Sequence, residues 1–124
     1  MKLFDQTIGF LQRSLDLRTA RHKIVSTNIA NSETPNYQSM DIPFQKVLER
    51  SVHQDSTIQL KKTHSSHLSE GFENTIEVEF SKEGVNIDQE MANLAENNLM
   101  FQAGVQALVK KLEALKATIS EGGK

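Results

Sequence analysis

The amino-terminal part of the chain carries apolar residues in alternating steps of four and three. This spacing is typical of a heptad seam along one side of an α-helix. It predicts a helix from Leu3 to Ala30, about 42 Å long at 1.5 Å per residue. The seam positions are Phe4, Ile8, Leu11, Leu15, Arg18, His22, Val25 and Ile29.

A second apolar row follows the same predicted helix. Its members recur every seven residues, about 130° around the helix from the first seam, and are Leu3, Phe10, Leu17 and Ile24. One seam requires one partner helix, so two rows indicate two partners. We therefore expect the second row to pack against another subunit.

The carboxyl-terminal third repeats the four-and-three spacing more regularly. The predicted helix spans residues 88–120 and is capped either by Asn86 with Gln89 or by Asp88 with Glu90. A pair of glycines ends it. Its seam positions are Ile87, Met91, Leu94, Asn98, Phe101, Val105, Leu108, Leu112, Leu115 and Ile119.

Together the two seams predict a mainly α-helical fold, in which two long terminal helices pair as an antiparallel, coiled-coil-like hairpin. We expect an amino-terminal helix over 1–31, an irregular connecting segment with a short β element over 32–86, and a carboxyl-terminal helix over 87–124. With 124 residues, the chain is too short for two independent cores, so these parts form one structural unit.

Two residues of the second predicted helix, one on the seam and one beside it, stand out from the apolar residues around them. Asn98 is the polar member of an otherwise apolar seam, and a lone asparagine at such a position typically fixes register or partner number. We therefore predict that Asn98 aligns the terminal helices. Gly104 has two interpretations, a site of close approach by another backbone or a tolerated surface glycine.

The connecting segment is rich in turn formers and polar residues. Residues 44–48 are compatible with a short helical turn. Further along, one alternation places Glu77 and Glu79 on the opposite face from three apolar residues, which predicts a short half-buried strand with a charged outer face. Disorder is an alternative for residues 50–72. The inward residues are Ile76, Val78 and Phe80, with Ile58 and Leu60 as the expected hairpin partner.

Composition excludes several classes of function. The net charge of −2 gives no basic surface for nucleic acid, and the absence of cysteine removes disulfides and thiolate metal sites. Polar residues interrupt the amino-terminal apolar run, so we expect neither a cleaved signal peptide nor a membrane span. No glycine-rich phosphate loop is present. His64 and His67 have a metal-compatible spacing without a recognisable third ligand, so we expect no metal, cofactor, small-molecule substrate or catalytic residue.

The residues that follow the first helix resemble a known family signature. Residues 28–37 read NIANSETPNY, which is similar to the segment ending the first long helix in the bacterial flagellar rod, hook and hook-associated axial proteins. Asn31 is suited to a left-handed helix end, and Pro35 prevents the helix from continuing. A glycine is common in the family where Asn36 stands. The motif residues are Asn28, Asn31, Thr34, Pro35 and Tyr37.

Further segments narrow the resemblance to the proximal rod members of that family. These segments are LDLRTARHKIVSTNIAN, MDIPF, KKTHSSHL and GVNIDQEMANLAENNLMFQA. The resemblance implies a structural subunit of the basal-body rod in the periplasmic space, exported by the flagellar type III apparatus without a cleaved signal. Its implied partners are copies of itself, other rod proteins, the membrane ring and its adaptor.

Three functions therefore compete. The favoured one is a rod subunit that assembles through its terminal helices and transmits torque. The second is a coiled-coil adaptor or chaperone, which would form a closed oligomer. The third is a small enzyme using His64 and His67, which would lose activity but not assembly when both are replaced by alanine.

Overall fold

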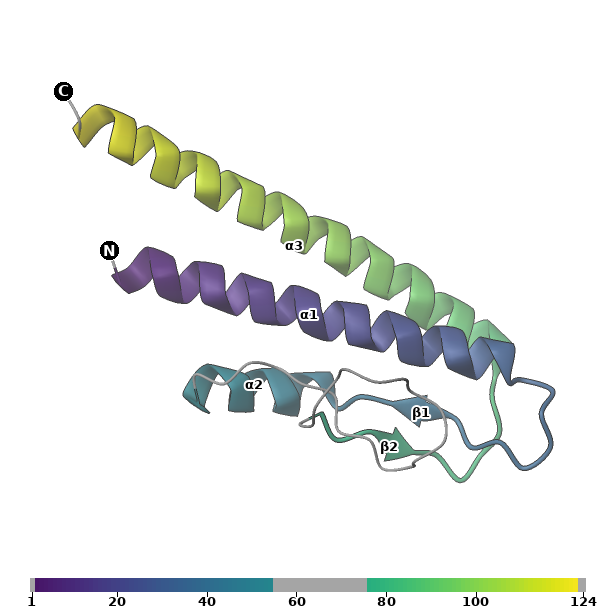
Figure 1. Ribbon diagram of the computed structural model, residues 1–124. Helices are drawn as coiled ribbons and strands as arrows, with labels where there is room; N and C mark the ends of the chain where they lie inside the picture. The colour runs from purple at the N-terminus through teal and green to yellow at the C-terminus, as the bar shows by residue number, and fades with distance from the viewer. Residues whose placement is uncertain (1, 55–75, 123–124) are drawn as a thin grey trace, which may run out of the picture.

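The computed structural model describes residues 2–54 and 76–122. Two long helices dominate it (Figure 1), and their free ends lie at the same end of the molecule, so they run antiparallel. The predicted helical hairpin with a short β element is confirmed. The elements in chain order are α1 (Lys2–Ala30), β1 (Met40–Asp41), α2 (Phe44–Gln54), β2 (Glu79–Phe80) and α3 (Ile87–Gly122).

The boundaries of the long helices follow from local capping. The Gln89 backbone N–H donates to Asn86 Oδ1 over 3.2 Å, so Asn86 is the cap that satisfies one of the free amides at the start of α3. Of the two predicted caps, this contact favours Asn86. The helix also continues through Gly122, slightly beyond its predicted end.

Helix α1 ends in a series of turns rather than in one left-handed residue. Asn31 donates from its backbone N–H and from Nδ2 to the Thr27 carbonyl, and its Oδ1 accepts from Thr34 Oγ1. The prediction of a left-handed Asn31 is wrong. Among the described residues, Asn36 is the non-glycine residue with positive φ, at 60°. A glycine adopts that conformation without steric cost, and asparagine tolerates it better than most residues.

The β element forms from residues far apart in the sequence. Strands β1 and β2 pair antiparallel, with Met40 opposite Phe80 and Asp41 opposite Glu79. The predicted partners, Ile58 and Leu60, lie outside the described residues. Burial follows the predicted alternation at four positions: Ile76 is buried, Val78 is half-buried, and Glu77 and Glu79 are exposed. Phe80 is exposed, contrary to its predicted inward position.

The hydrophobic core lies between α1 and the connecting segment. Helix α1 forms a middle layer, with α3 on one side and α2 and the β element on the other (Figure 1). Leu17 and Ile24, from the second predicted row, are buried in this core. The expectation that another subunit covers them is therefore wrong. The other core residues are Ala20, Ile42, Val47 and Ile76, with Met40, Phe44, Leu48 and Val78 packed against them.

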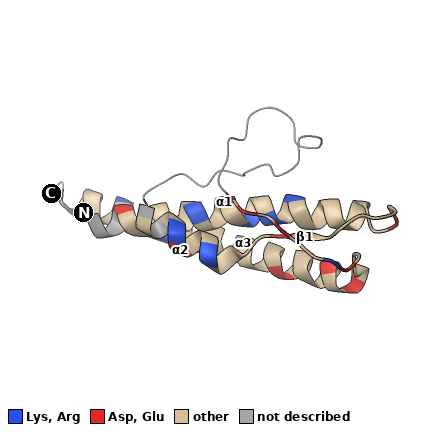
Figure 2. Cartoon of the chain, turned by 90° about the horizontal axis from the view of Figure 1, so that it is seen from below, with Lys and Arg blue, Asp and Glu red and all other residues tan. Residues whose placement is uncertain are grey.

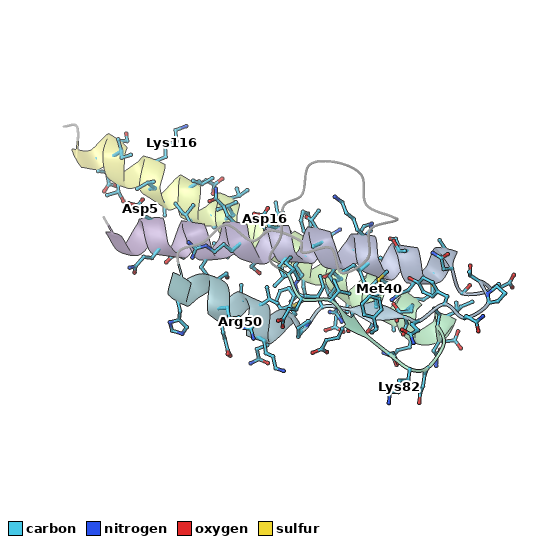
Figure 3. The ribbon with its side chains drawn as sticks, turned by 60° about the horizontal axis from the view of Figure 1, so that its bottom comes forward. Asp5, Asp16, Met40, Arg50, Lys82 and Lys116 are labelled. Carbon is cyan, nitrogen blue, oxygen red and sulfur yellow. The ribbon has the colours of Figure 1, made fainter. Side chains whose placement is uncertain are left out.

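Helix α2 explains this difference, because it is longer than the predicted turn. Its apolar residues follow helical spacing at Phe44, Val47 and Leu48, and they face α1. Arg50 points away from α1 (Figure 3) and pairs with Glu77 at 3.4 Å. The second row of α1 is thus covered within the chain at Leu17 and Ile24, whereas Phe10 remains exposed and the Leu3 side chain lies outside the described part.

Candidate assembly interface

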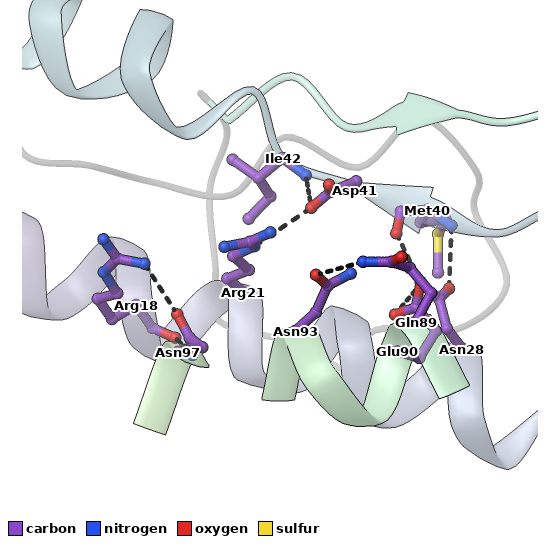
Figure 4. A network of polar contacts seen from close by, with 10 residues as sticks. All are labelled: Arg18, Arg21, Asn28, Met40, Asp41, Ile42, Gln89, Glu90, Asn93 and Asn97. Carbon is purple, nitrogen blue, oxygen red and sulfur yellow. Dashed lines mark hydrogen bonds and ion pairs between the residues drawn. The ribbon is translucent and has the colours of Figure 1, made fainter. Parts of the chain in front are cut away.

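Asn28 ties three parts of the chain together. Its side chain is fully buried, with 0% exposure. Oδ1 accepts from the Tyr37 hydroxyl and from the Met40 backbone N–H, each over 2.9 Å. Nδ2 donates to the Met40 carbonyl over 2.7 Å and to Glu90 Oε2 over 3.2 Å (Figure 4). One amide therefore holds α1, the start of β1 and the first turns of α3 in a fixed arrangement.

Tyr37 takes part in this network in its protonated form. Burial of the phenol and, secondarily, the negative charge of Glu90 raise the pKa of Tyr37 above its ordinary value. The protonated hydroxyl is also the form that donates to Asn28. Deprotonation would replace this donor with a negative oxygen facing an acceptor.

We expect the folded chain to lose stability at alkaline pH because of this shift. A raised folded-state pKa stabilises the protein fully below the unfolded tyrosine value of about 10, and this stabilisation is lost as pH rises through the folded value. The chain has one tyrosine and no tryptophan, so phenolate absorbance reports Tyr37 directly. Tyr37→Phe should cost about 1 kcal/mol at neutral pH and remove the alkaline component. Titration at the ordinary tyrosine pKa would contradict the expectation.

A second buried amide joins α3 to α1. Asn97 is 1% exposed and is the buried residue of Ile87–Gly122. Its Nδ2 donates to the Arg18 carbonyl over 2.8 Å, and Arg18 Nη1 donates to its Oδ1 over 3.5 Å (Figure 4). The Arg18 guanidinium carbon also lies 3.9 Å from the centroid of the Phe44 ring in α2, within the range of a cation–π contact. Arg18 therefore links all three helices.

The guanidinium keeps its charge at this junction. Burial lowers the pKa of Arg18, nearby Arg21 lowers it further, and Glu96 acts in the opposite direction. Arginine nevertheless remains protonated in proteins. The guanidinium thus stays available as a donor to Asn97 and as a cation over Phe44.

Asn97, not the predicted Asn98, aligns the two helices of one chain. Asn98 is exposed, so its predicted role in the intrachain seam is wrong. The reason is geometric: Leu94, Asn97 and Phe101 follow one another in steps of three and four and share one face of α3, whereas Asn98 lies about 100° around the helix from Asn97. Asn97 was not among the predicted residues, although it fits the steps of three and four between Leu94 and Phe101 as well as Asn98 does.

We expect Asn97→Leu and Asn98→Leu to behave differently in the isolated chain. Asn97→Leu leaves the Arg18 carbonyl without its side-chain donor and should cost about 1 to 3 kcal/mol of unfolding free energy. Asn98→Leu changes an exposed position and should stay within about 0.5 kcal/mol of the parent. Urea unfolding followed by circular dichroism measures both. Equal effects would refute the assignment of register to Asn97.

Strand β1 is held against α1 by polar contacts that the sequence did not predict. Arg21 Nε lies 3.4 Å from Asp41 Oδ1, which also accepts from the Ile42 backbone N–H over 2.8 Å (Figure 4). Together with Glu90 and Phe44, these residues had no distinguishing spacing in the sequence. Their partners come from other elements, so the contacts become visible only in the folded chain.

Gly104 lies at the contact between the two long helices. A Cβ added there would come 2.9 Å from Leu15 Cδ2. This distance is shorter than ordinary van der Waals contact, so the Leu15 side chain would have to shift. Of the two interpretations of Gly104, close approach is the one that the structure favours.

The predicted seams meet along part of their length. On α1, Val25 is buried, four other apolar seam residues and Arg18 are half-buried, and His22 is exposed, whereas the Phe4 side chain lies outside the described part. On α3, one residue in seven is half-buried, a set that we call the inner row. The half-buried apolar seam residues of α1 are Ile8, Leu11, Leu15 and Ile29, and the inner row is Leu94, Phe101, Leu108 and Leu115.

The other half of the α3 seam faces solvent. This outer row lies beside the inner row, and Met91 and Ile119 are 55% and 63% exposed. Among the described residues, ten large apolar side chains are exposed and eight of them lie on α3. Helix α3 is therefore the element with unsatisfied apolar surface. The outer row consists of Met91, Asn98, Val105, Leu112 and Ile119.

The two long helices also separate toward their free ends. They lie close near Asn28 and diverge toward the termini marked N and C (Figure 1). Burial agrees, because the buried residues described on α1 fall between Leu17 and Asn28, and none is described on α3 after Asn97. Near the end of α3, Lys116 projects away from α1 (Figure 3). The free ends thus lack the packing present at the closed end.

Neither a metal site nor a membrane-spanning helix is found among the described residues. Among residues 2–54 and 76–122, no group of three or more His, Cys, Asp or Glu side chains is placed to hold a metal ion. No helix in the same ranges combines the length and apolar character needed to cross a bilayer. His64 and His67 lie outside the described residues.

Comparison with known proteins gives one consistent group of relatives. No family model matches the chain. It is 32% identical to the flagellar basal body rod protein FlgB of Bacillus subtilis over the full length of both chains. It is 30% identical to the Escherichia coli protein of that name, covering 95% of this chain and 96% of the relative. The Buchnera aphidicola protein is 35% identical, over 82% of this chain and 84% of the relative.

Proposed function

Because this chain belongs to the FlgB family of flagellar basal body rod proteins, we propose that α3 is the helix through which it is built into the rod. The chain is a structural subunit of the flagellar basal body and not an enzyme. The closed-oligomer adaptor is not favoured.

The exposed outer row of α3 is the observation that carries this proposal. Burying one Leu, Ile, Met or Val side chain completely contributes about 1.5 to 3 kcal/mol. The outer row holds four such side chains along one line, continuous with the inner row that already packs on α1. A neighbouring helix placed along this line would bury them together. The predicted seam therefore divides into an inner row for folding and an outer row for assembly.

The remaining predicted assembly residues support the same arrangement. Phe10 is the exposed member of the second row on α1 and lies on the half of that helix that diverges from α3. We propose that neighbouring subunits cover this half of α1, including the predicted positions Leu3 and Phe4. We also propose that residues 1–31 and 87–124 act as axial helices and that 32–86 holds them together.

The motif residues have a structural role in this proposal. Asn28 and Tyr37 fix the closed end of the hairpin, while Asn31 and Thr34 form the turns after α1. Pro35 is exposed in the same turns. Torque transmission requires that subunits do not deform, and a buried polar network with every partner present is rigid.

The partners that we propose are copies of this chain and other rod proteins. We further propose, from family membership, that the subunit passes through the flagellar export apparatus without a cleaved signal. It would then meet the adaptor and the membrane ring at the base of the rod. These contacts would place it in the proximal part of the rod.

Deleting the gene tests the proposed function. We expect the deletion strain to lose swimming in soft agar and to lack basal bodies with a rod, and plasmid-borne wild-type protein to restore both. The chain should co-purify with basal bodies from the restored strain. Normal swimming without the gene, or absence of the chain from purified basal bodies, would refute a role as a rod subunit.

A further inference from the structure

The methionines of the described part of the chain differ in their access to solvent. Met40 is half-buried at the start of β1 and packs against the hydrophobic core. Met91 and Met100 lie on α3 and are 55% and 48% exposed. Met1 lies outside the described residues. The two methionines of α3 are therefore more open to small reagents in water than Met40 is.

Met91 and Met100 lie on opposite sides of α3. They are nine positions apart, which corresponds to about 180° around a helix that turns 100° per residue. Met91 is the first member of the outer row, which continues through Val105 and Leu112. Met100 is not on that row. Two methionines of similar exposure thus lie one on the proposed assembly surface and one away from it.

The charges around Met91 select the kind of oxidant that reaches it. Figure 2 shows acidic residues along the first part of α3, which are Asp88, Glu90 and Glu96. No Lys or Arg stands between Glu83 and Lys110 in the sequence. A negative surface repels anionic oxidants such as hypochlorite but does not repel an uncharged molecule. Hydrogen peroxide is small and uncharged at neutral pH, so it is the oxidant that fits these surroundings.

The reaction of an exposed thioether with hydrogen peroxide requires no other reagent. The sulfur lone pair attacks one peroxide oxygen, the O–O bond breaks, and the second oxygen leaves as water after proton transfer. The sulfur is oxidised by two electrons to the sulfoxide, and the peroxide is reduced by the same two electrons. An apolar side chain thereby becomes polar, and methionine sulfoxide reductases reverse the change.

We propose that Met91 is an oxidation site of the unassembled subunit, and that its sulfoxide opposes incorporation into the rod until a reductase restores the thioether. This inference rests on the proposed function, because the outer row is the proposed assembly surface, and it adds a means of regulating that surface. The sulfoxide stays hydrated on the isolated chain, so the fold is kept. At an interface it loses the gain from burying an apolar side chain, which corresponds to about tenfold or more in affinity.

Peroxide treatment of the purified chain tests the reaction itself. Tandem mass spectrometry assigns each added oxygen to one methionine, and circular dichroism measures helix content. We expect Met91 and Met100 to be oxidised at similar rates, at least about threefold faster than Met40, with helix content unchanged. Oxidation of Met91 no faster than that of Met40 would overturn the proposal.

Competition for places in the rod tests the effect on assembly. Met91→Gln imitates the polar sulfoxide, and it is produced in the same cells as the parent chain. Mass spectrometry gives the ratio of the two chains in purified basal bodies and in whole cells. We expect Met91→Gln to be under-represented in basal bodies by about tenfold or more. Met91→Leu, which is apolar, and Met100→Gln, which makes the same change away from the outer row, should be incorporated like the parent.

The outcomes separate this inference from the proposed function. Equal incorporation of Met91→Gln and the parent, or an equal loss for Met100→Gln, would overturn the inference while leaving the rod role intact. Peroxide treatment of purified basal bodies adds a second readout, in which Met91 of the parent chain should be oxidised about fivefold more slowly than in the free chain. Equal rates would also overturn the inference. If the parent chain is absent from basal bodies, the proposed function itself fails.

Discussion

Replacing Asn28 with leucine is expected to cause a large loss of stability. The change removes four hydrogen bonds and leaves the Met40 backbone N–H, the Met40 carbonyl and the Tyr37 hydroxyl without their partner. Each buried polar group left unpaired costs about 1 to 3 kcal/mol, and the combined effect should be about 3 to 5 kcal/mol. In a small domain this is a large share of the total stability. Thermal unfolding followed by circular dichroism should show Tm lowered by at least about 10 °C.

Asn98→Leu is the matched control, because it makes the same chemical change at an exposed position.

Asn28→Asp tests the network more finely. It keeps Oδ1 as an acceptor but replaces the donor that faces the Glu90 carboxylate, so two negative groups come together at neutral pH. The loss of unfolding free energy caused by Asn28→Asp should become smaller as pH falls and one of the two facing carboxyl groups becomes protonated. If Asn28→Leu stayed within about 1 kcal/mol of the parent, the network would be incidental to folding.

Replacing Leu112 with aspartate is expected to abolish assembly and leave the isolated chain folded. Leu112 is on the exposed outer row, so the substitution should change the unfolding free energy by only about 0.5 kcal/mol. In the rod the same position would be buried against a neighbour, where an unpaired charge costs several kcal/mol. That cost corresponds to a loss of affinity of about 100-fold or more. Soft-agar swimming and immunoblots of purified basal bodies measure the result.

Two controls separate assembly from helix stability. Leu112→Met keeps an apolar side chain of similar volume and should swim normally. Gln45→Asp adds the same charge to the exposed surface of α2 and should also be incorporated. Swimming cells that carry Leu112→Asp at normal abundance would show that the outer row is not an assembly surface.

The long helices could be predicted from the sequence because their signals are local. Heptad spacing from Phe4 onward and the cap at Asn86 each involve residues within a few positions of one another. The antiparallel pairing followed from two seams on one short chain. These features needed no knowledge of what lies on the far side of each helix.

The sequence did not predict which partner covers each apolar face of the long helices. The second row of α1 indicated an additional partner, but periodicity does not say whether that partner belongs to the same chain. Helix α2 supplies it for Leu17 and Ile24. Its spacing at Phe44, Val47 and Leu48 is helical, yet the run is short and follows a proline-containing segment, so it was predicted as a single turn.

The same limit applies to the choice between two adjacent residues, Asn97 and Asn98. Asn97 and Asn98 lie about 100° apart around the helix, but each of them continues the steps of three and four between Leu94 and Phe101, so periodicity does not distinguish them. The Arg18 carbonyl selects Asn97. The signature residue Asn28 was found by resemblance, but its four hydrogen bonds join it to three residues, of which Glu90 is 62 positions away.

The divergence of the two long helices has a mechanical consequence. The ties at Asn28, Arg21 and Asn97 all attach to the second half of α1, while the first half carries none of these three. Each subunit is therefore held most firmly at the closed end of the hairpin, where these contacts join α1 to β1 and α3.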